Sequence, residues 1–116
     1  MKKILKLFLL LVCGALTLCS CEQPDEYELP EGANVSMIAR IDKIDEKLEV
    51  MVKESEYTYG THLVITSDST QYIGKDGQKI TRDDLRAAQV VEILYNGQVM
   101  LSYPPQIVAL RITVIE

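Results

Sequence analysis

Two cysteines stand one residue apart near the start of the sequence, Cys19 and Cys21. Paired thiols can form a disulfide, bind a metal or accept a covalent modification. No cysteine follows position 21, and a structural zinc takes four ligands where this pair supplies two. The pattern therefore disfavours a disulfide or a metal site and favours a covalent modification.

The residues before Cys21 indicate which modification this is. Three lysines within the first six residues precede an apolar run over residues 7–18, which is the plan of a secretory signal peptide and is too short to span a membrane. The sequence Leu18-Cys19-Ser20-Cys21 resembles the lipobox of bacterial lipoproteins, in which a small residue precedes the lipidated cysteine. This resemblance implies a signal peptide over residues 1–20, lipidation of Cys21, and an extracytoplasmic, membrane-anchored protein of the bacterial cell envelope.

The composition after residue 20 limits the classes of partner. Removing residues 1–20 takes away three lysines and no acidic residue, which moves the net charge from −5 to −8. Binding to nucleic acid needs concentrated lysine and arginine, so we expect none. Residues 21–34 hold the lipidated cysteine and an acidic, proline-containing stretch that predicts a flexible tether, and residues 35–116 form one domain.

The sequence offers little support for catalysis. His62 is the one histidine, and a serine nucleophile would need it as a base together with an orienting partner, so we expect it to be locally bonded or exposed to solvent. Asp83-Asp84 and the acids of residues 42–49 read as solvated faces, and Lys43 and Lys47 interrupt any calcium-loop pattern. We expect no catalytic residue, no metal and no cofactor; a small envelope hydrolase or metal-dependent enzyme is the alternative.

Alternating apolar and polar residues predict a mainly β domain. A short helix is expected over residues 81–89, where Thr81 and Asp84 have the spacing of a capping box. Asn96-Gly97 predicts a hairpin because both central residues of a type I′ turn need positive φ. The expected strands cover 35–42, 48–53, 62–66 continued through 70–73, 90–95 and 98–103 on either side of the hairpin turn, and 107–115. The expected inward positions are Val35, Met37, Ala39 and Ile41 in the first strand, Leu48, Val50 and Val52 in the second, and Val108, Leu110, Ile112 and Val114 in the last.

Two segments, Thr70–Leu85 and Ser102–Ile115 with its Ser-Tyr-Pro, resemble the YobA-like domain of unknown function found in bacterial lipoproteins. The resemblance covers about residues 36–115. It implies a β-barrel in an extracytoplasmic lipoprotein and supplies no known catalytic residue. That family usually has a glycine near Ala88, so a helical turn is expected there in this chain. Together with the order of elements, this predicts a small five-stranded OB-like barrel with one short helix.

Tyrosines mark the expected binding region. Barrels of this type commonly bind through their second and third strands and the adjoining loops. That region contains Tyr57, Tyr59, His62 and Tyr72, and tyrosine is enriched in recognition surfaces. We expect a non-catalytic module that contacts an envelope protein, a peptide or a glycan through these residues. Packing at the rim of the barrel is the alternative role for each of them.

Overall fold

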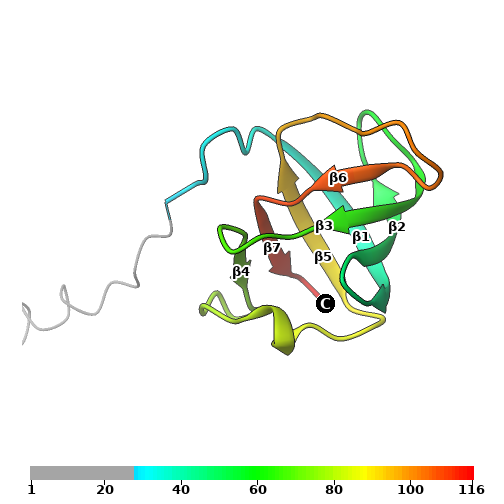
Figure 1. Cartoon of the computed structure of the whole chain (residues 1–116). Helices are drawn as coiled ribbons and strands as arrows, with labels where there is room; N and C mark the ends of the chain where they lie inside the picture. The colour runs from blue at the N-terminus through cyan, green and yellow to red at the C-terminus, as the bar shows by residue number, and fades with distance from the viewer. Residues whose placement is uncertain (1–27) are drawn as a thin grey trace, which may run out of the picture.

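The computed structural model of the chain describes residues 28–116, so the expected signal peptide and Cys21 lie outside the described residues. Within that range the chain forms seven strands and one short 3₁₀ turn, η1 (Arg82–Asp84), shown in Figure 1. No helix in this part of the chain is long and apolar enough to span a membrane. The strands are β1 (Val35–Ile44), β2 (Leu48–Glu54), β3 (Gly60–Ile65), β4 (Gln71–Ile73), β5 (Val90–Tyr95), β6 (Gln106–Val108) and β7 (Arg111–Val114).

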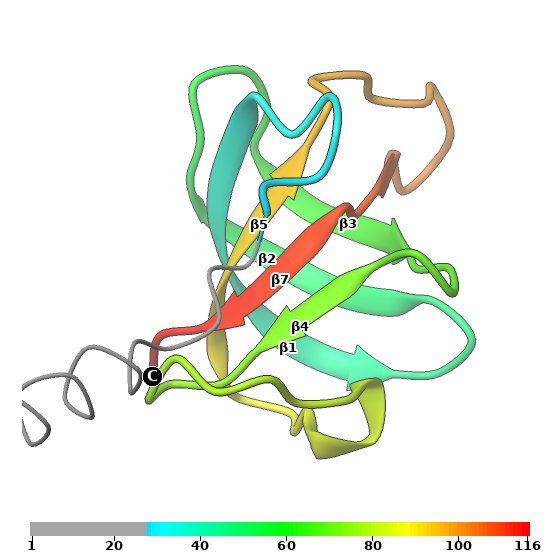
Figure 2. The same cartoon turned by 90° about the vertical axis from the view of Figure 1, so that its left-hand side faces the viewer.

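All seven strands belong to one mixed sheet with the order β4-β7-β5-β1-β2-β3-β6. Four neighbouring pairs are antiparallel, whereas β3 pairs with β6 and β4 pairs with β7 in parallel. The sheet is strongly curved (Figures 1 and 2). The prediction of a mainly β domain is confirmed. The five-stranded OB-like barrel is wrong, because the described chain has seven strands in an open sheet.

The expected last strand, residues 107–115, is divided in two by a change of partner. Ile107 and Ala109 are buried, and the next buried residues are Ile112 and Val114, so the inward positions change from odd to even numbers. One extra residue between two inward positions reverses which face each side chain takes. The predicted inward positions at 112 and 114 are confirmed. Val108 and Leu110 were also expected to face inward, but Val108 is 39 % exposed and Leu110 is only half-buried.

The third expected strand is also interrupted, next to the point where residues 107–115 change partner. The loop of residues 66–70 separates β3 from β4, and Thr70 in this loop is buried. Its hydroxyl donates to the carbonyl oxygen of Ala109 over 2.9 Å and accepts the N–H of Ser67 over 3.0 Å. This side chain therefore joins the two interruptions, and each half of the 60–73 segment keeps a parallel partner in residues 106–114.

The predicted hairpin at Asn96-Gly97 is wrong. Gly97 has φ +89°, but Asn96 does not have the positive φ that a type I′ turn also needs. The Asn96 side chain instead accepts the N–H of Gln98 over 2.9 Å, which is an Asx turn. Residues 96–105 consequently form a long loop instead of a strand paired with β5. Within this loop Met100 turns back and forms a two-way backbone bridge with Gln106.

The predicted helix over residues 81–89 is reduced to the single turn η1. Its start has the predicted bonding, since the Asp84 carboxylate accepts the backbone N–H of Thr81 over 2.9 Å. Ala88 has φ +74°, a left-handed conformation that costs a residue with a Cβ about 1–2 kcal/mol. The expected helical turn at Ala88 is therefore wrong. The conformation lets the Ala88 N–H reach the carbonyl oxygen of Ile41, which continues the β1 to β5 pairing.

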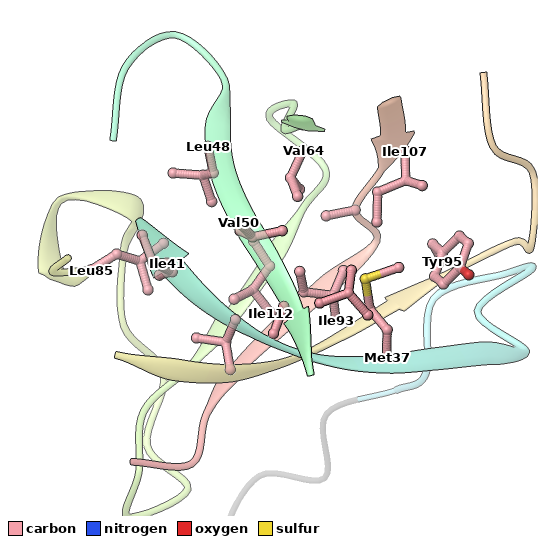
Figure 3. Packing of buried hydrophobic residues seen from close by; sticks show 14 of the residues in the cluster. Met37, Ile41, Leu48, Val50, Val64, Leu85, Ile93, Tyr95, Ile107 and Ile112 are labelled. Carbon is pink, nitrogen blue, oxygen red and sulfur yellow. The ribbon is translucent and has the colours of Figure 1, made fainter. Parts of the chain in front are cut away.

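The inner face of the curved sheet carries the core. Figure 3 shows Val50 of β2 close to Ile112 of β7 in the middle of the cluster, with Ile93 of β5 beside them and Leu85 next to Ile41 at one end. Full burial of such a side chain contributes about 1.5–3 kcal/mol relative to leaving it exposed. Tyr95 is also fully buried, and its hydroxyl has no hydrogen-bond partner among the described residues.

Residues 28–34, the described part of the expected tether, contact the domain. The carbonyl oxygen of Glu28 accepts hydrogen bonds from the side chains of Gln71 and Arg111, on β4 and β7. Ala33 is buried, and its N–H donates to the carbonyl oxygen of Pro30. Six residues therefore lie between Cys21 and Glu28, and the seven steps along the chain reach at most about 25 Å.

Candidate binding surface

The loop of residues 96–105 is held in place by several hydrogen bonds. The Ser102 hydroxyl donates to the carbonyl oxygen of Pro104 over 2.6 Å and accepts from Nε2 of Gln106 over 3.1 Å. Oε1 of the same glutamine accepts from Nζ of Lys47 over 2.9 Å. The backbone bridge between Met100 and Gln106 closes the loop. Side chains on this loop are thus presented from a fixed backbone, which lowers the entropy lost when a partner binds.

Two large side chains of this loop lie entirely in solvent. Leu101 is 101 % exposed and Tyr103 is 103 % exposed. The backbone carbonyl of Pro105 accepts the N–H of Leu63 in β3, so the loop lies beside the start of that strand. A pocket of about 460 Å³ is formed here. We call this pocket, together with the neighbouring loop residues Met100 and Leu101, the aromatic surface. Its pocket is lined by Tyr59, Thr61, Tyr103, Pro104 and Pro105.

Tyr57 and Tyr59 are both exposed, at 66 % and 74 %, but they line different pockets. Tyr57 lies with Asn34, Ser36 and Glu56 around a smaller pocket of about 240 Å³. A hydrogen bond to the Glu56 carboxylate, together with its negative charge, raises the pKa of Tyr57 above its ordinary value of 10.0. Of these two predicted residues, only Tyr59 contributes to the aromatic surface.

His62 lies inside the domain, fully buried in β3. Its Nδ1 is 3.1 Å from the carbonyl oxygen of Gly60, and because a carbonyl only accepts, Nδ1 carries the hydrogen. Nε2 lies 2.6 Å from the Thr58 hydroxyl, which donates to it in the neutral ring. Both ring nitrogens are engaged with the segment that carries Tyr57 and Tyr59, so His62 supports the β2–β3 loop from below.

Tyr72 lies elsewhere, on β4, in a pocket of about 420 Å³ that we call the polar pocket. Its other lining residues are mainly hydroxyl-bearing or charged: Thr66, Ser67, Asp68, Thr70, Ile80, Thr81 and Arg82. The Arg82 guanidinium donates to the carbonyl oxygens of Asp45 and Glu46, and its Nε lies 3.3 Å from the Thr66 hydroxyl. The structure therefore does not bring Tyr72 together with Tyr59.

Leu101 and Tyr103 are the surface residues that the sequence pattern did not single out as a site. The stretch 98–103 was predicted to be the second strand of the Asn96-Gly97 hairpin. Pro104 and Pro105 directly after it were the signal to the contrary, because two successive prolines remove two ladder donors. An apolar stretch that cannot continue in a ladder is free to present its side chains to solvent.

The chemistry of the aromatic surface suits binding. Tyrosine rings and the Leu101 side chain supply apolar contact area, and the tyrosine hydroxyls can hydrogen-bond at its edges. The outer side of β6 is already bonded to Met100, and β4 is bonded to Lys79 and Ile80, so neither edge offers a free ladder for an added strand. Among residues 28–116 no group of three or more histidine, cysteine, aspartate or glutamate residues is placed to hold a metal ion.

Residues 35–116 match the family model described as a protein of unknown function, DUF3221. The match covers the whole seven-stranded sheet, and the chain belongs to this family. Comparison with curated proteins found no match. Comparison with solved structures found none either.

Proposed function

We propose that this protein is a non-catalytic binding module of the bacterial cell envelope, lipid-anchored through Cys21 and kin to the YobA-like lipoproteins. Its domain lies outside the cytoplasm and contacts an envelope protein, either a different protein or a second copy of this chain, through the aromatic surface. The signal-like residues 1–20 and the lipobox-like Leu18-Cys19-Ser20-Cys21 support the location. The aromatic surface supports the mode of action.

The observation that carries the proposal is the complete exposure of Leu101 and Tyr103 on a hydrogen-bonded loop. Single exposed apolar residues are ordinary, but contiguous ones mark interaction sites. Tyrosine in particular is enriched among the residues that carry most of the energy of an interface. Tyr103 lines one pocket with Tyr59 and the two prolines, and Leu101 lies two residues before it on the same loop.

The position of His62 supports a binding module over an enzyme. A histidine acting as a general base needs one ring nitrogen within reach of the proton it removes. Here one nitrogen is bonded to the Gly60 carbonyl and the other to the Thr58 hydroxyl, and the side chain is fully buried. The role of this ring is the support of the β2–β3 loop.

Replacing Cys21 by alanine tests the anchor. Cys21→Ala removes the thiol that accepts the lipid, so we expect it to abolish labelling by an alkyne fatty-acid analogue in growing bacteria. Cys19→Ala is the matched control and should label like the natural chain, because Cys19 leaves with the signal peptide. Equal labelling of the two variants would contradict lipidation at Cys21.

A photoreactive residue in place of Leu101 tests the surface in intact bacteria. Irradiation should give a protein adduct, because this side chain meets the partner at close range. Lys79 is exposed on the turn after β4 and is the control position, where we expect little or no adduct. Similar yields at both positions would show that the aromatic surface has no specific partner.

A further inference from the structure

We propose that the partner on the aromatic surface is a second copy of this chain, bound through the same surface in a two-fold dimer. The inference rests on the proposed function and names its partner. In a two-fold dimer the same patch is used on both copies, so the patch must tolerate its own charge and shape. Three properties support such a dimer: the charge of this surface, its exposed apolar area and its position relative to the anchor.

The first property is the absence of charge. Loop residues 96–105 contain no aspartate, glutamate, lysine or arginine, and neither do residues 60–67, which include the start of β3 beside it. Without the signal residues the chain carries a net charge of −8, so two copies repel each other at most orientations. A charge-free face is the place where two copies approach at the lowest electrostatic cost. A strongly basic partner, in contrast, would gain little there.

One charged group contacts the base of the loop, since Nζ of Lys47 donates to Oε1 of Gln106, and the next charges lie at the end of β2 and in the β2–β3 loop. Lys53, Glu54 and Glu56 precede Tyr59, and Glu56 lies with Tyr57 around the other pocket. None of these residues is among those that line the pocket of the aromatic surface.

The second property is the amount of exposed apolar surface. A tyrosine side chain buries roughly 150–250 Å² when covered, so Tyr59 and Tyr103 at 74 % and 103 % exposure contribute about 350 Å². Leu101 and Met100 bring the total to about 500 Å² per copy. A standard interface takes about 800 Å² per partner, and weak transient contacts take less than about 600 Å². The surface therefore suits a weak, reversible dimer.

The third property is the geometry of attachment. Glu28 is bonded to β4 and β7, whereas the aromatic surface lies beside β3 and β6, at the other end of the strand order. The 96–105 loop begins beside residues 32–35, and Figure 1 shows it running from there to the side of the domain away from the start of the described chain. The anchored side thus leaves the aromatic surface open. Two copies held on one membrane have a raised effective concentration, so a weak contact is enough for them to pair.

The test uses the full-length protein in bacteria that express two differently tagged copies. The photoreactive residue replaces Leu101 in one copy, and Lys79 is again the control position. We expect an adduct that contains both tags. Tyr103→Ser in the copy without the probe should lower the yield of this adduct roughly tenfold or more, as removal of a central anchor does. Tyr57→Ser is the matched control, since Tyr57 is an exposed tyrosine on the other pocket, and it should leave the yield unchanged.

The possible results separate the two proposals. An adduct between position 101 and a different protein would overturn the dimer and leave the proposed function standing. A two-tag adduct that is unaffected by Tyr103→Ser would also overturn the dimer through this surface. No excess of protein adduct at position 101 over position 79, including capture of lipid alone, would overturn both.

Discussion

The polar pocket and the aromatic surface are both hollows at the surface, but their side chains do different things. In the polar pocket Thr70 and Arg82 bond to segments far away in the chain, at Ala109 and at residues 45–46. At the aromatic surface Leu101 and Tyr103 lie wholly in solvent, and the loop beneath them is held by Ser102. The polar groups of the first region are used to hold the sheet together. The side chains of the second are presented outward, which points to a role in binding.

The largest effect on stability should come from the polar pocket. Thr70→Val keeps the shape of the side chain but removes the hydroxyl, and this leaves the Ala109 carbonyl and the Ser67 N–H without their partner. Unpaired buried groups cost about 1–3 kcal/mol, so we expect the free energy of unfolding to fall by about 2–3 kcal/mol in urea titrations. Thr70→Ser retains both bonds and should lose about 1 kcal/mol or less. If serine were as damaging as valine, the methyl group of Thr70 would contribute as much to stability as its hydroxyl, and the two hydrogen bonds would not dominate.

A smaller change in stability, of the opposite sign, is expected at Tyr95, directly before the 96–105 loop. Tyr95 is buried at the end of β5 and its hydroxyl is unpaired, so Tyr95→Phe removes a desolvated polar group without changing the ring. We expect the free energy of unfolding to rise by about 1 kcal/mol, measured by the same titration. A decrease of similar size would mean that the hydroxyl has a partner in solution.

The smallest effect on stability should come from the aromatic surface. The double variant Leu101→Ser with Tyr103→Ser removes side chains that are already in water, so the free energy of unfolding should change by less than about 0.5 kcal/mol. Thermal and urea unfolding of the natural chain and the variant should therefore nearly coincide. A loss of more than about 1 kcal/mol would remove the contrast between the two regions, because these side chains would then be packing residues.

Local patterns predicted the strands where one periodicity holds throughout. Met37, Ala39 and Ile41 alternate as expected along β1, and Leu48, Val50 and Val52 do so along β2. Both strands are central in the sheet and keep one buried face over these residues. An alternation with period two is sufficient to assign such strands.

The binding region was predicted less completely. Tyr59 was singled out, and the structure places it on the aromatic surface. Tyr72 was grouped with it because OB-like strand pairing was assumed, whereas β4 pairs with β7 and faces another pocket. Which loops meet at one end of a sheet depends on strand order, and strand order depends on contacts between residues far apart in the chain.

The sequence by itself determined the acidic character of the chain, its lipobox-like pattern at Cys21 and the faces of β1 and β2, because each of these depends on composition or on neighbouring residues. The tertiary structure decided the rest. Asn96 bonds its own backbone instead of making a hairpin turn, the extra residue near Ala109 sends one segment to two partners, and the 96–105 loop then folds beside β3. The last two outcomes depend on long-range pairing energies, which no local pattern contains. The exposure of Leu101 and Tyr103 is their consequence.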